Sequence, residues 1–113
     1  MDSTEIINKI YELVDKLDTM SLDWAKAKAQ HNYYQRLEKI TVNTQKAKST
    51  KKTSVAKEEE AYCSPEYKEL NEKTFTVDLN YYHLDFKKDL YGKELDGLRS
   101  HLSFEKQQIN RTI

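Results

Sequence analysis

Residues 67–109, YKELNEKTFTVDLNYYHLDFKKDLYGKELDGLRSHLSFEKQQI, decide the fold, because they repeat with a period of seven. Most of the repeating positions are apolar or aromatic, whereas the residues between them are largely Glu, Asp, Lys and Asn. This spacing predicts one long α-helix whose single stripe needs a partner helix along its length. Steps of three and four residues from Tyr67 lead to Leu70, Thr74, Val77, Tyr81, Leu84, Lys88, Tyr91, Leu95, Leu98, Leu102, Glu105 and Ile109.

The apolar members of this stripe are the residues expected to contact a partner, either a helix of the same chain or another copy. They are Leu70, Val77, Tyr81, Leu84, Tyr91, Leu95, Leu98 and Leu102. A second apolar row is predicted to lie beside the stripe, and it suggests a further contact with a neighbouring subunit. This row consists of Phe75, Leu79, Tyr82, Phe86 and Leu90.

The first half of the chain carries a matching stripe. Between Ala27 and Tyr33 its register slips, which predicts a gentle change of supercoil without a break. The stripe comprises Ile6, Ile10, Leu13, Leu17, Met20, Trp24 and Ala27, and then Tyr33 or Tyr34, Leu37, Ile40, Thr44 and Ala47. The two halves together predict an all-α fold, a long antiparallel helical hairpin that resembles a coiled coil and is expected to be oligomeric.

Cap signals place the helix boundaries inside a single domain of residues 1–113. The first helix is expected over about 4–48, with Ser3 or Thr4 as its cap. A Ser/Thr/Lys-rich connection over about 48–54 follows, and the pattern leaves open whether it is a loop or continuous helix. Thr53 or Ser54 is expected to cap a short helix over about 55–62. Ser64-Pro65 predicts the start of a long helix over about 65–108.

Composition excludes several classes of protein. Two glycines and one proline in 113 residues disfavour a β-fold with many turns. No run approaches the roughly 18 apolar residues of a membrane span, and the acidic start Met1–Glu5 is unlike a signal peptide. The single cysteine, Cys63, rules out an internal disulfide framework and fits a reducing cytoplasm. A cytoplasmic location is therefore expected, in the host cell if the protein is encoded by a phage.

The formal net charge is zero, but the charges are segregated along the chain. Residues 36–57 have a net charge of +6, and residues 58–96 have a net charge of −6. Lysine and hydroxyl side chains are suited to phosphate contacts, which need no base-reading geometry. The alternative is a charged loop that only keeps the protein dispersed. The candidate nucleic-acid-binding residues are Arg36, Lys39, Lys46, Lys48, Lys51, Lys52 and Lys57, with Arg99, Lys106 and Arg111 near the C-terminus.

No catalytic constellation is recognisable. His31, His83 and His101 are far apart in the sequence, and none has an acid and a nucleophile at a known spacing. The run Glu58–Glu60 is more typical of a solvated helix start than of a metal site. The sequence therefore predicts no enzyme activity, no catalytic residue, no metal and no cofactor.

The order of these features resembles the small helical-hairpin recombination mediators of bacteriophages, the UvsY-like proteins. The resemblance rests on Tyr33-Tyr34 with Arg36, on AKEEEAYCSPEYK at residues 56–68, on Leu98-Arg99-Ser100 and on Ser103-x-x-Lys106. It implies an oligomer that binds single-stranded DNA and helps to load a recombinase onto strands coated by a single-strand-binding protein. It also implies that the lysines of residues 46–57, with Arg99 and Lys106, contact the DNA.

A second hypothesis is a protein-binding module, such as a phage inhibitor of a host or defence protein, or a structural coiled-coil adaptor. In that case the acidic residues 58–96 would meet a basic partner.

Overall fold

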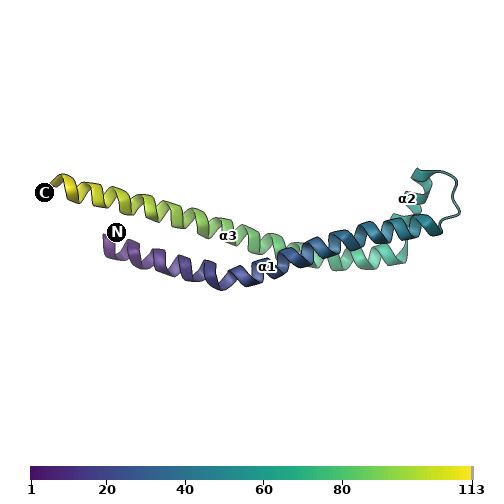
Figure 1. Ribbon diagram of the computed structural model, residues 1–113, viewed down its shortest axis with the longest axis horizontal. Helices are drawn as coiled ribbons and strands as arrows, with labels where there is room; N and C mark the ends of the chain where they lie inside the picture. Colours follow the sequence, from purple (N-terminus) through teal and green to yellow (C-terminus); the bar gives the residue numbers. More distant parts are fainter. Residues whose placement is uncertain (113) are drawn as a thin grey trace. The chain divides into compact units, whose positions relative to one another are not determined.

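The computed structural model describes residues 1–112, with side chains up to residue 111, and this part of the chain contains helices and no strand. Helix α1 spans Ser3–Lys48, α2 spans Ser54–Tyr62 and α3 spans Pro65–Thr112 (Figure 1). The predicted all-α helical hairpin is therefore confirmed. Residues 49–53 form the loop between α1 and α2, so the connection is not continuous helix.

Asp2 caps α1, so the expectation that Ser3 or Thr4 would do so is wrong. The amide of Glu5 donates to Asp2 Oδ1 over 2.8 Å, and the amide of Ile6 donates to the Asp2 carbonyl oxygen over 3.0 Å. A carboxylate at this position satisfies a free amide and also interacts favourably with the positive end of the helix dipole.

The other two caps lie where the sequence predicts them. Thr53 Oγ1 accepts from the amide of Ala56 over 3.1 Å at the start of α2. Ser64 Oγ accepts from the amide of Tyr67 over 3.2 Å, and Pro65 begins α3. Proline costs nothing there, because the first amides of a helix have no partner within it. These caps fix both ends of the short connection between the long helices.

Interhelical contacts group the chain into two compact units, whereas the sequence pattern alone treats residues 1–113 as one domain. Unit 1 consists of residues 1–24 and 83–112, and unit 2 consists of residues 25–82. Each unit contains an antiparallel pair formed by a segment of α1 and a segment of α3, and unit 2 also contains α2. Unit 1 has eight basic and eleven acidic residues, a net charge of −3, and unit 2 has eleven basic and eight acidic, a net charge of +3.

The predicted stripe of α3 is the side of the helix that packs within each unit, and it is called the seam below. Thr74 and Leu95 are buried. At the two ends of the stripe, Tyr67 is half-buried whereas Ile109 is exposed. Burial therefore fades in the last turns of α3. Leu70, Val77, Tyr81, Leu84, Tyr91, Leu98 and Leu102 are all half-buried.

The seam of α1 keeps its seven-residue register, so the predicted slip after Ala27 is absent. Ile40, which a slipped register would place in the seam, is 58% exposed, and Thr44 and Ala47 are exposed as well. An unbroken helix turns about 100° per residue, so the stripe continues at the same spacing even where its residues are polar. The half-buried positions that continue it are His31, Tyr34, Glu38, Thr41 and Gln45.

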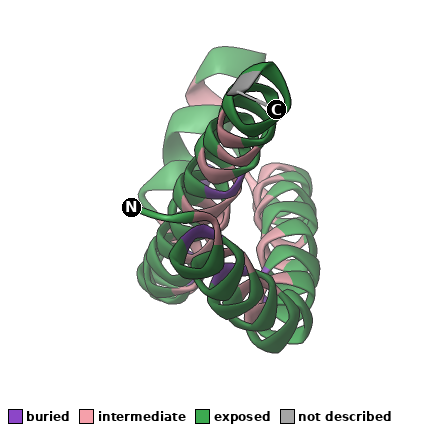
Figure 2. Ribbon diagram, turned by 90° about the vertical axis from the view of Figure 1, so that its left-hand side faces the viewer, coloured by how far each residue is buried: buried purple, intermediate pink, exposed green. Residues whose placement is uncertain are grey.

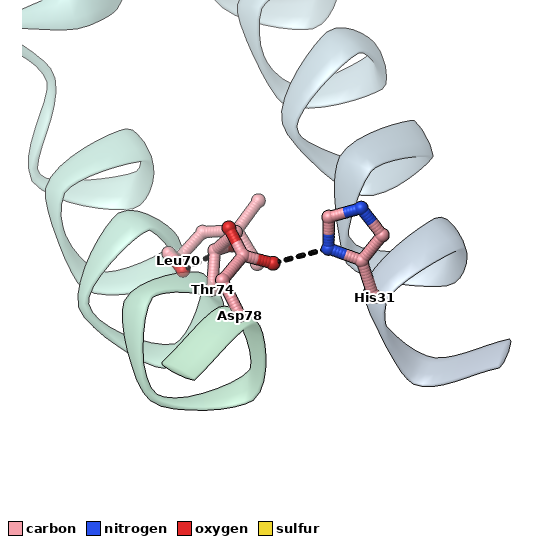
Figure 3. Close-up of polar contacts among 4 residues, drawn as sticks. All are labelled: His31, Leu70, Thr74 and Asp78. Carbon is pink, nitrogen blue, oxygen red and sulfur yellow. Dashed lines mark hydrogen bonds and ion pairs between the residues drawn. The ribbon is translucent and has the colours of Figure 1, made fainter. Parts of the chain in front are cut away.

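Polar side chains hold the seam of unit 2 together beside His31. The Nδ1 atom of His31 lies 2.6 Å from Asp78 Oδ1, and its ring stacks on Tyr81 with 4.7 Å between ring centres. One turn earlier, Thr74 Oγ1 donates to the Leu70 carbonyl oxygen over 2.9 Å and so stays within its own helix (Figure 3). A half-buried hydrogen-bonded pair of this kind favours one register of the two helices over its neighbours.

The second apolar row of α3 lies on the outside of the helix, not beside the seam as predicted. A rotation of about 100° per residue places its members roughly 130–180° from the middle of the seam. Their exposed fractions run from 42% for Leu90 to 67% for Phe86. Figure 2 shows that most of the helical surface is exposed and that few residues are buried. The outer row, as it is called below, comprises Phe75, Leu79, Tyr82, Phe86 and Leu90.

Candidate nucleic-acid interface

The predicted basic residues fall into two groups. Seven belong to unit 2 and lie on the second half of α1, in the following loop and on α2: Arg36, Lys39, Lys46, Lys48, Lys51, Lys52 and Lys57. Arg99, Lys106 and Arg111 lie on α3 in unit 1. The two groups therefore belong to different units, and only the first forms a cluster around one connection.

The cations of the first group, called the basic segment, are accessible. Lys46 and Lys57 are half-buried, and the other five are exposed. Within the described chain, none of the seven forms an ion pair with a carboxylate. Their charges are therefore free to meet the phosphates of a nucleic acid without first breaking an internal pair.

Several of the hydroxyl groups that accompany these lysines are already engaged in local structure. Ser49 Oγ donates to Glu60 Oε2 over 2.6 Å and accepts from the amide of Lys51 over 3.1 Å. Thr53 Oγ1 caps α2, and Thr44 Oγ1 donates to the Ile40 carbonyl oxygen over 2.8 Å. These three hydroxyls stabilise the loop and the helices, so they are less available for phosphate contacts than the lysines.

The connection that carries most of the basic segment also carries acidic residues, which offset much of its positive charge. Residues 45–66, which span the end of α1, the loop, α2 and the start of α3, hold five lysines and four glutamates. The link from Ser49 to Glu60 ties the loop to the acidic run Glu58–Glu60 of α2. The net charge of this connection is +1 and not the +6 of residues 36–57, so any binding to DNA is expected to be weak and sensitive to salt.

A hollow of about 440 Å³ lies beside this cluster between α1, α2 and the start of α3. Lys39, Lys46 and Glu58 line it with Tyr62 and Tyr67, together with Gln35, Glu38, Val42 and Asn43. Two of the predicted DNA-binding lysines therefore border a cavity that also contains carboxylates.

Glu38 occupies a seam position in this hollow. Its Oε1 atom is buried and has no hydrogen-bond partner among the described residues. Burial raises the pKa of the Tyr67 phenol, and the nearby Glu38 carboxylate and Tyr62 add to the shift. The rings of Tyr62 and Tyr67 meet edge to face with 5.0 Å between their centres. A seam carboxylate at this place repels phosphate, so Lys39 and Lys46 are less favourable DNA contacts than the lysines of the loop.

The histidines do not converge on a common site. His31 pairs with Asp78 in unit 2, and His101 Nε2 lies 3.4 Å from Glu105 Oε1 on the same face of α3 in unit 1. In the described residues, no group of three or more His, Cys, Asp or Glu side chains is placed to hold a metal ion. Cys63 is exposed and unpaired.

The pattern of apolar residues does not indicate the polar contacts of the seam. Trp24 Nε1 donates to Asp85 Oδ1 in unit 1, and His31 meets Asp78 in unit 2. The unbroken seven-residue register of α1 indicates His31 and Glu38 as seam positions when it is followed by spacing alone. Hydrophobicity does not indicate either residue, because both are polar.

Comparisons with known proteins give no relative for this chain. No family model matches it, and neither the curated proteins nor the solved structures contain a match. Over the described residues, no helix has a stretch long and apolar enough to span a membrane.

Proposed function

We propose that this chain is a non-enzymatic accessory protein of DNA recombination or replication, which binds single-stranded DNA through the basic segment of unit 2. The observation that carries the proposal is the set of seven cations on the second half of α1, in the following loop and on α2, none of which forms an internal ion pair in the described chain. Backbone phosphates need only accessible positive charge, and an assembly of several copies would strengthen a weak contact.

The role in loading a recombinase rests on the resemblance to the UvsY-like mediators. That resemblance includes the residues around the connection, at positions 56–68, which form most of α2 and the start of α3. A partner recombinase, a single-strand-binding protein and a phage origin belong to the same proposal.

DNA binding is tested by fluorescence anisotropy with a labelled oligothymidine over a series of salt concentrations. The wild type is expected to bind at low salt, and the variant with Lys46, Lys48, Lys51 and Lys52 changed to Glu is expected to lose binding. The double variant Lys51→Gln/Lys52→Gln is expected to lower the slope of log affinity against log salt by about 0.7 per lost phosphate contact.

The control is Lys9→Gln/Lys87→Gln, which removes two exposed lysines from unit 1 and the same total charge. It is expected to bind as the wild type does. The proposal fails if the wild type does not bind at low salt, or if both double variants lose the same affinity.

The exposed Phe75, Leu79 and Tyr82 of unit 2 support a second candidate function, a protein-binding module. An exposed row of Phe, Leu and Tyr on an outer helix face is typical of a protein contact. The predicted acidic face, residues 58–96, is shared between the two units and is therefore not a surface of either unit alone. Absent DNA binding at low salt, together with a defined host complex that Phe75→Glu abolishes, would favour this function.

A further inference from the structure

The hollow between α1, α2 and the start of α3 combines negative charge with aromatic rings. Its volume of about 440 Å³ lies within the range of about 300–1,000 Å³ that is usual for small-ligand pockets. All the residues that line it belong to unit 2, so the hollow is formed within that unit alone. Two of them are glutamates and two are tyrosines, namely Glu38, Glu58, Tyr62 and Tyr67.

Glu38 makes the hollow a favourable place for a cation. Its Oε1 atom is buried and has no hydrogen-bond partner among the described residues, although the side chain as a whole is only half-buried. A carboxylate that loses water from one oxygen without gaining a hydrogen bond is costly. A positive charge on the open side of this carboxylate offsets the cost, because opposite charges attract more strongly where water is partly excluded.

The rings of Tyr62 and Tyr67 favour an organic cation over a metal ion. They stand at 89° to each other, and a ring face attracts a cation that lies within about 6 Å of its centre. Burial raises the pKa of the Tyr67 phenol and Glu38 adds to the shift, so the ring and the carboxylate are close enough to act on the same ligand. In the part of the chain that the structure describes, no group of three or more His, Cys, Asp or Glu is placed to hold a metal ion.

The lysines of the hollow limit the charge that a ligand can carry. Lys39 and Lys46 also line it, and neither forms an ion pair with a carboxylate in the described chain. A ligand with a second positive charge would be repelled by these lysines, and a phosphate would be repelled by the two glutamates. A single cation is therefore favoured.

A guanidinium group suits this set of side chains better than an ammonium group does. It is planar, stacks on aromatic rings and presents several N–H donors to a carboxylate. An ammonium group is compact and more strongly hydrated, so it loses more water on entering a half-buried site.

We propose that the hollow of unit 2 binds the guanidinium group of one arginine side chain, which donates to Glu38 and packs against the rings of Tyr62 and Tyr67. The site goes beyond the proposed function and does not rest on it, because it takes a positively charged ligand whereas the basic loop takes a negatively charged one. An arginine of a partner protein and free arginine share this chemistry, and the experiment separates the two sources.

The first test uses the wild type with isotope-labelled tyrosine rings and records their nuclear magnetic resonance signals. Titration with N-acetyl-arginine amide is expected to shift the signals of Tyr62 and Tyr67 to saturation. N-acetyl-citrulline amide, which has nearly the same shape but no charge, is expected to leave them unchanged, and N-acetyl-lysine amide is expected to bind more weakly. The absence of a saturable shift, equal binding of the citrulline compound or equal binding of the lysine compound overturns the proposal.

The second test removes the carboxylate and keeps its shape. Glu38→Gln is expected to weaken the binding of N-acetyl-arginine amide about tenfold. The control Glu59→Gln removes the same charge from an exposed position of α2 that does not line the hollow, and it is expected to bind as the wild type does. Equal affinities of the two variants overturn the proposal. The comparison of arginine with citrulline needs no variant, so it stands even if Glu38→Gln does not fold.

The third test identifies the source of the guanidinium group. Free arginine also carries a carboxylate that Lys39 or Lys46 can meet, so tighter binding than that of the capped compound assigns the free amino acid. Equal binding assigns a side chain as a protein presents it, and either result supports the proposal. A carboxylate can also accept from the amino group of cytosine. Shifts with cytidine in place of N-acetyl-arginine amide would assign the hollow to a base and overturn the proposal.

These tests and the DNA-binding test fail separately. None of the three uses a DNA strand, so absent DNA binding defeats the proposed function alone. Absent binding of N-acetyl-arginine amide defeats the guanidinium site alone.

Discussion

Trp24 of α1 donates from its indole Nε1 to the carboxylate of Asp85 on α3 over 2.9 Å, and this bond joins the two helices of unit 1. The Lys88 ammonium lies 4.2 Å from the centre of the same ring, so one side chain takes part in a hydrogen bond and a cation–π contact. Both contacts lie at the half-buried edge of the seam, where an aromatic ring with one polar atom fits well.

Replacing Trp24 with Phe should destabilise unit 1, because a smaller aromatic ring without an N–H donor takes the place of the indole and the part-buried Asp85 oxygen loses that bond. The expected cost is about 1–2 kcal/mol in the free energy of unfolding. Urea unfolding followed by circular dichroism measures it. Asp85→Asn keeps an acceptor oxygen and should cost less than Trp24→Phe; equal losses would contradict the assignment of this bond.

The His31–Asp78 pair should behave as a coupled unit. Asp78→Ala leaves the His31 Nδ1 atom without the carboxylate and is expected to cost about 1–3 kcal/mol. The double variant His31→Leu/Asp78→Leu removes both polar groups and should recover much of that loss. A double-mutant cycle from urea unfolding gives the coupling energy, and a value near zero would show that the pair contributes nothing.

Two isoleucines test the register of α1 directly. Ile6 is fully buried and Ile40 is 58% exposed. Ile6→Ala should therefore cost about 2–4 kcal/mol, whereas Ile40→Ala should cost less than about 1 kcal/mol. Thermal or urea unfolding distinguishes them. A large loss for Ile40→Ala would restore the slipped register that hydrophobicity suggests.

Tyr67 predicts how stability changes in alkali. Its pKa is raised above the ordinary value of 10.0 in the folded chain, by burial first and then by Glu38 and Tyr62. The neutral phenol is therefore favoured by folding, so this contribution is complete below the unfolded pKa and is lost as the pH rises through the folded pKa. Tyr67→Phe should reduce the loss of stability above about pH 10, and Glu38→Gln should reduce it partly. Urea midpoints measured across this pH range test the prediction. If the midpoints of both variants fall with pH as steeply as those of the wild type, the prediction is contradicted.

Gly92 and Gly97 lie inside α3, and a Cβ added at either position meets nothing within 4 Å. Alanine should therefore stabilise the helix by about 0.5–1 kcal/mol at each position. Thermal unfolding checks the increase. A loss of stability in Gly97→Ala would instead indicate that another molecule approaches the helix there.

Much of the fold follows from local rules. Local sequence is enough to predict the stripe that begins at Tyr67. It is also enough to predict the cap at Ser64 and the start of α3 at Pro65. The course of the seam in α1 does not follow from hydrophobicity, because helical geometry carries it through His31 and Glu38 whatever their polarity. The basic segment and the acidic run Glu58–Glu60 that follows it are both visible in the sequence, whereas the bond that ties Ser49 of the loop to Glu60 forms only on folding.

The sequence by itself determined that the chain is helical, where α2 and α3 begin and which side of α3 packs against α1, because periodicity and capping act over one or two turns. Only the tertiary structure decided that Asp78 and Asp85 have partners on α1, that Glu60 meets the basic loop through Ser49, and that the outer row stays exposed. These outcomes depend on which residues of two distant helix segments lie opposite each other. That register is fixed by packing along the whole length of each helix pair, which no short stretch of sequence contains.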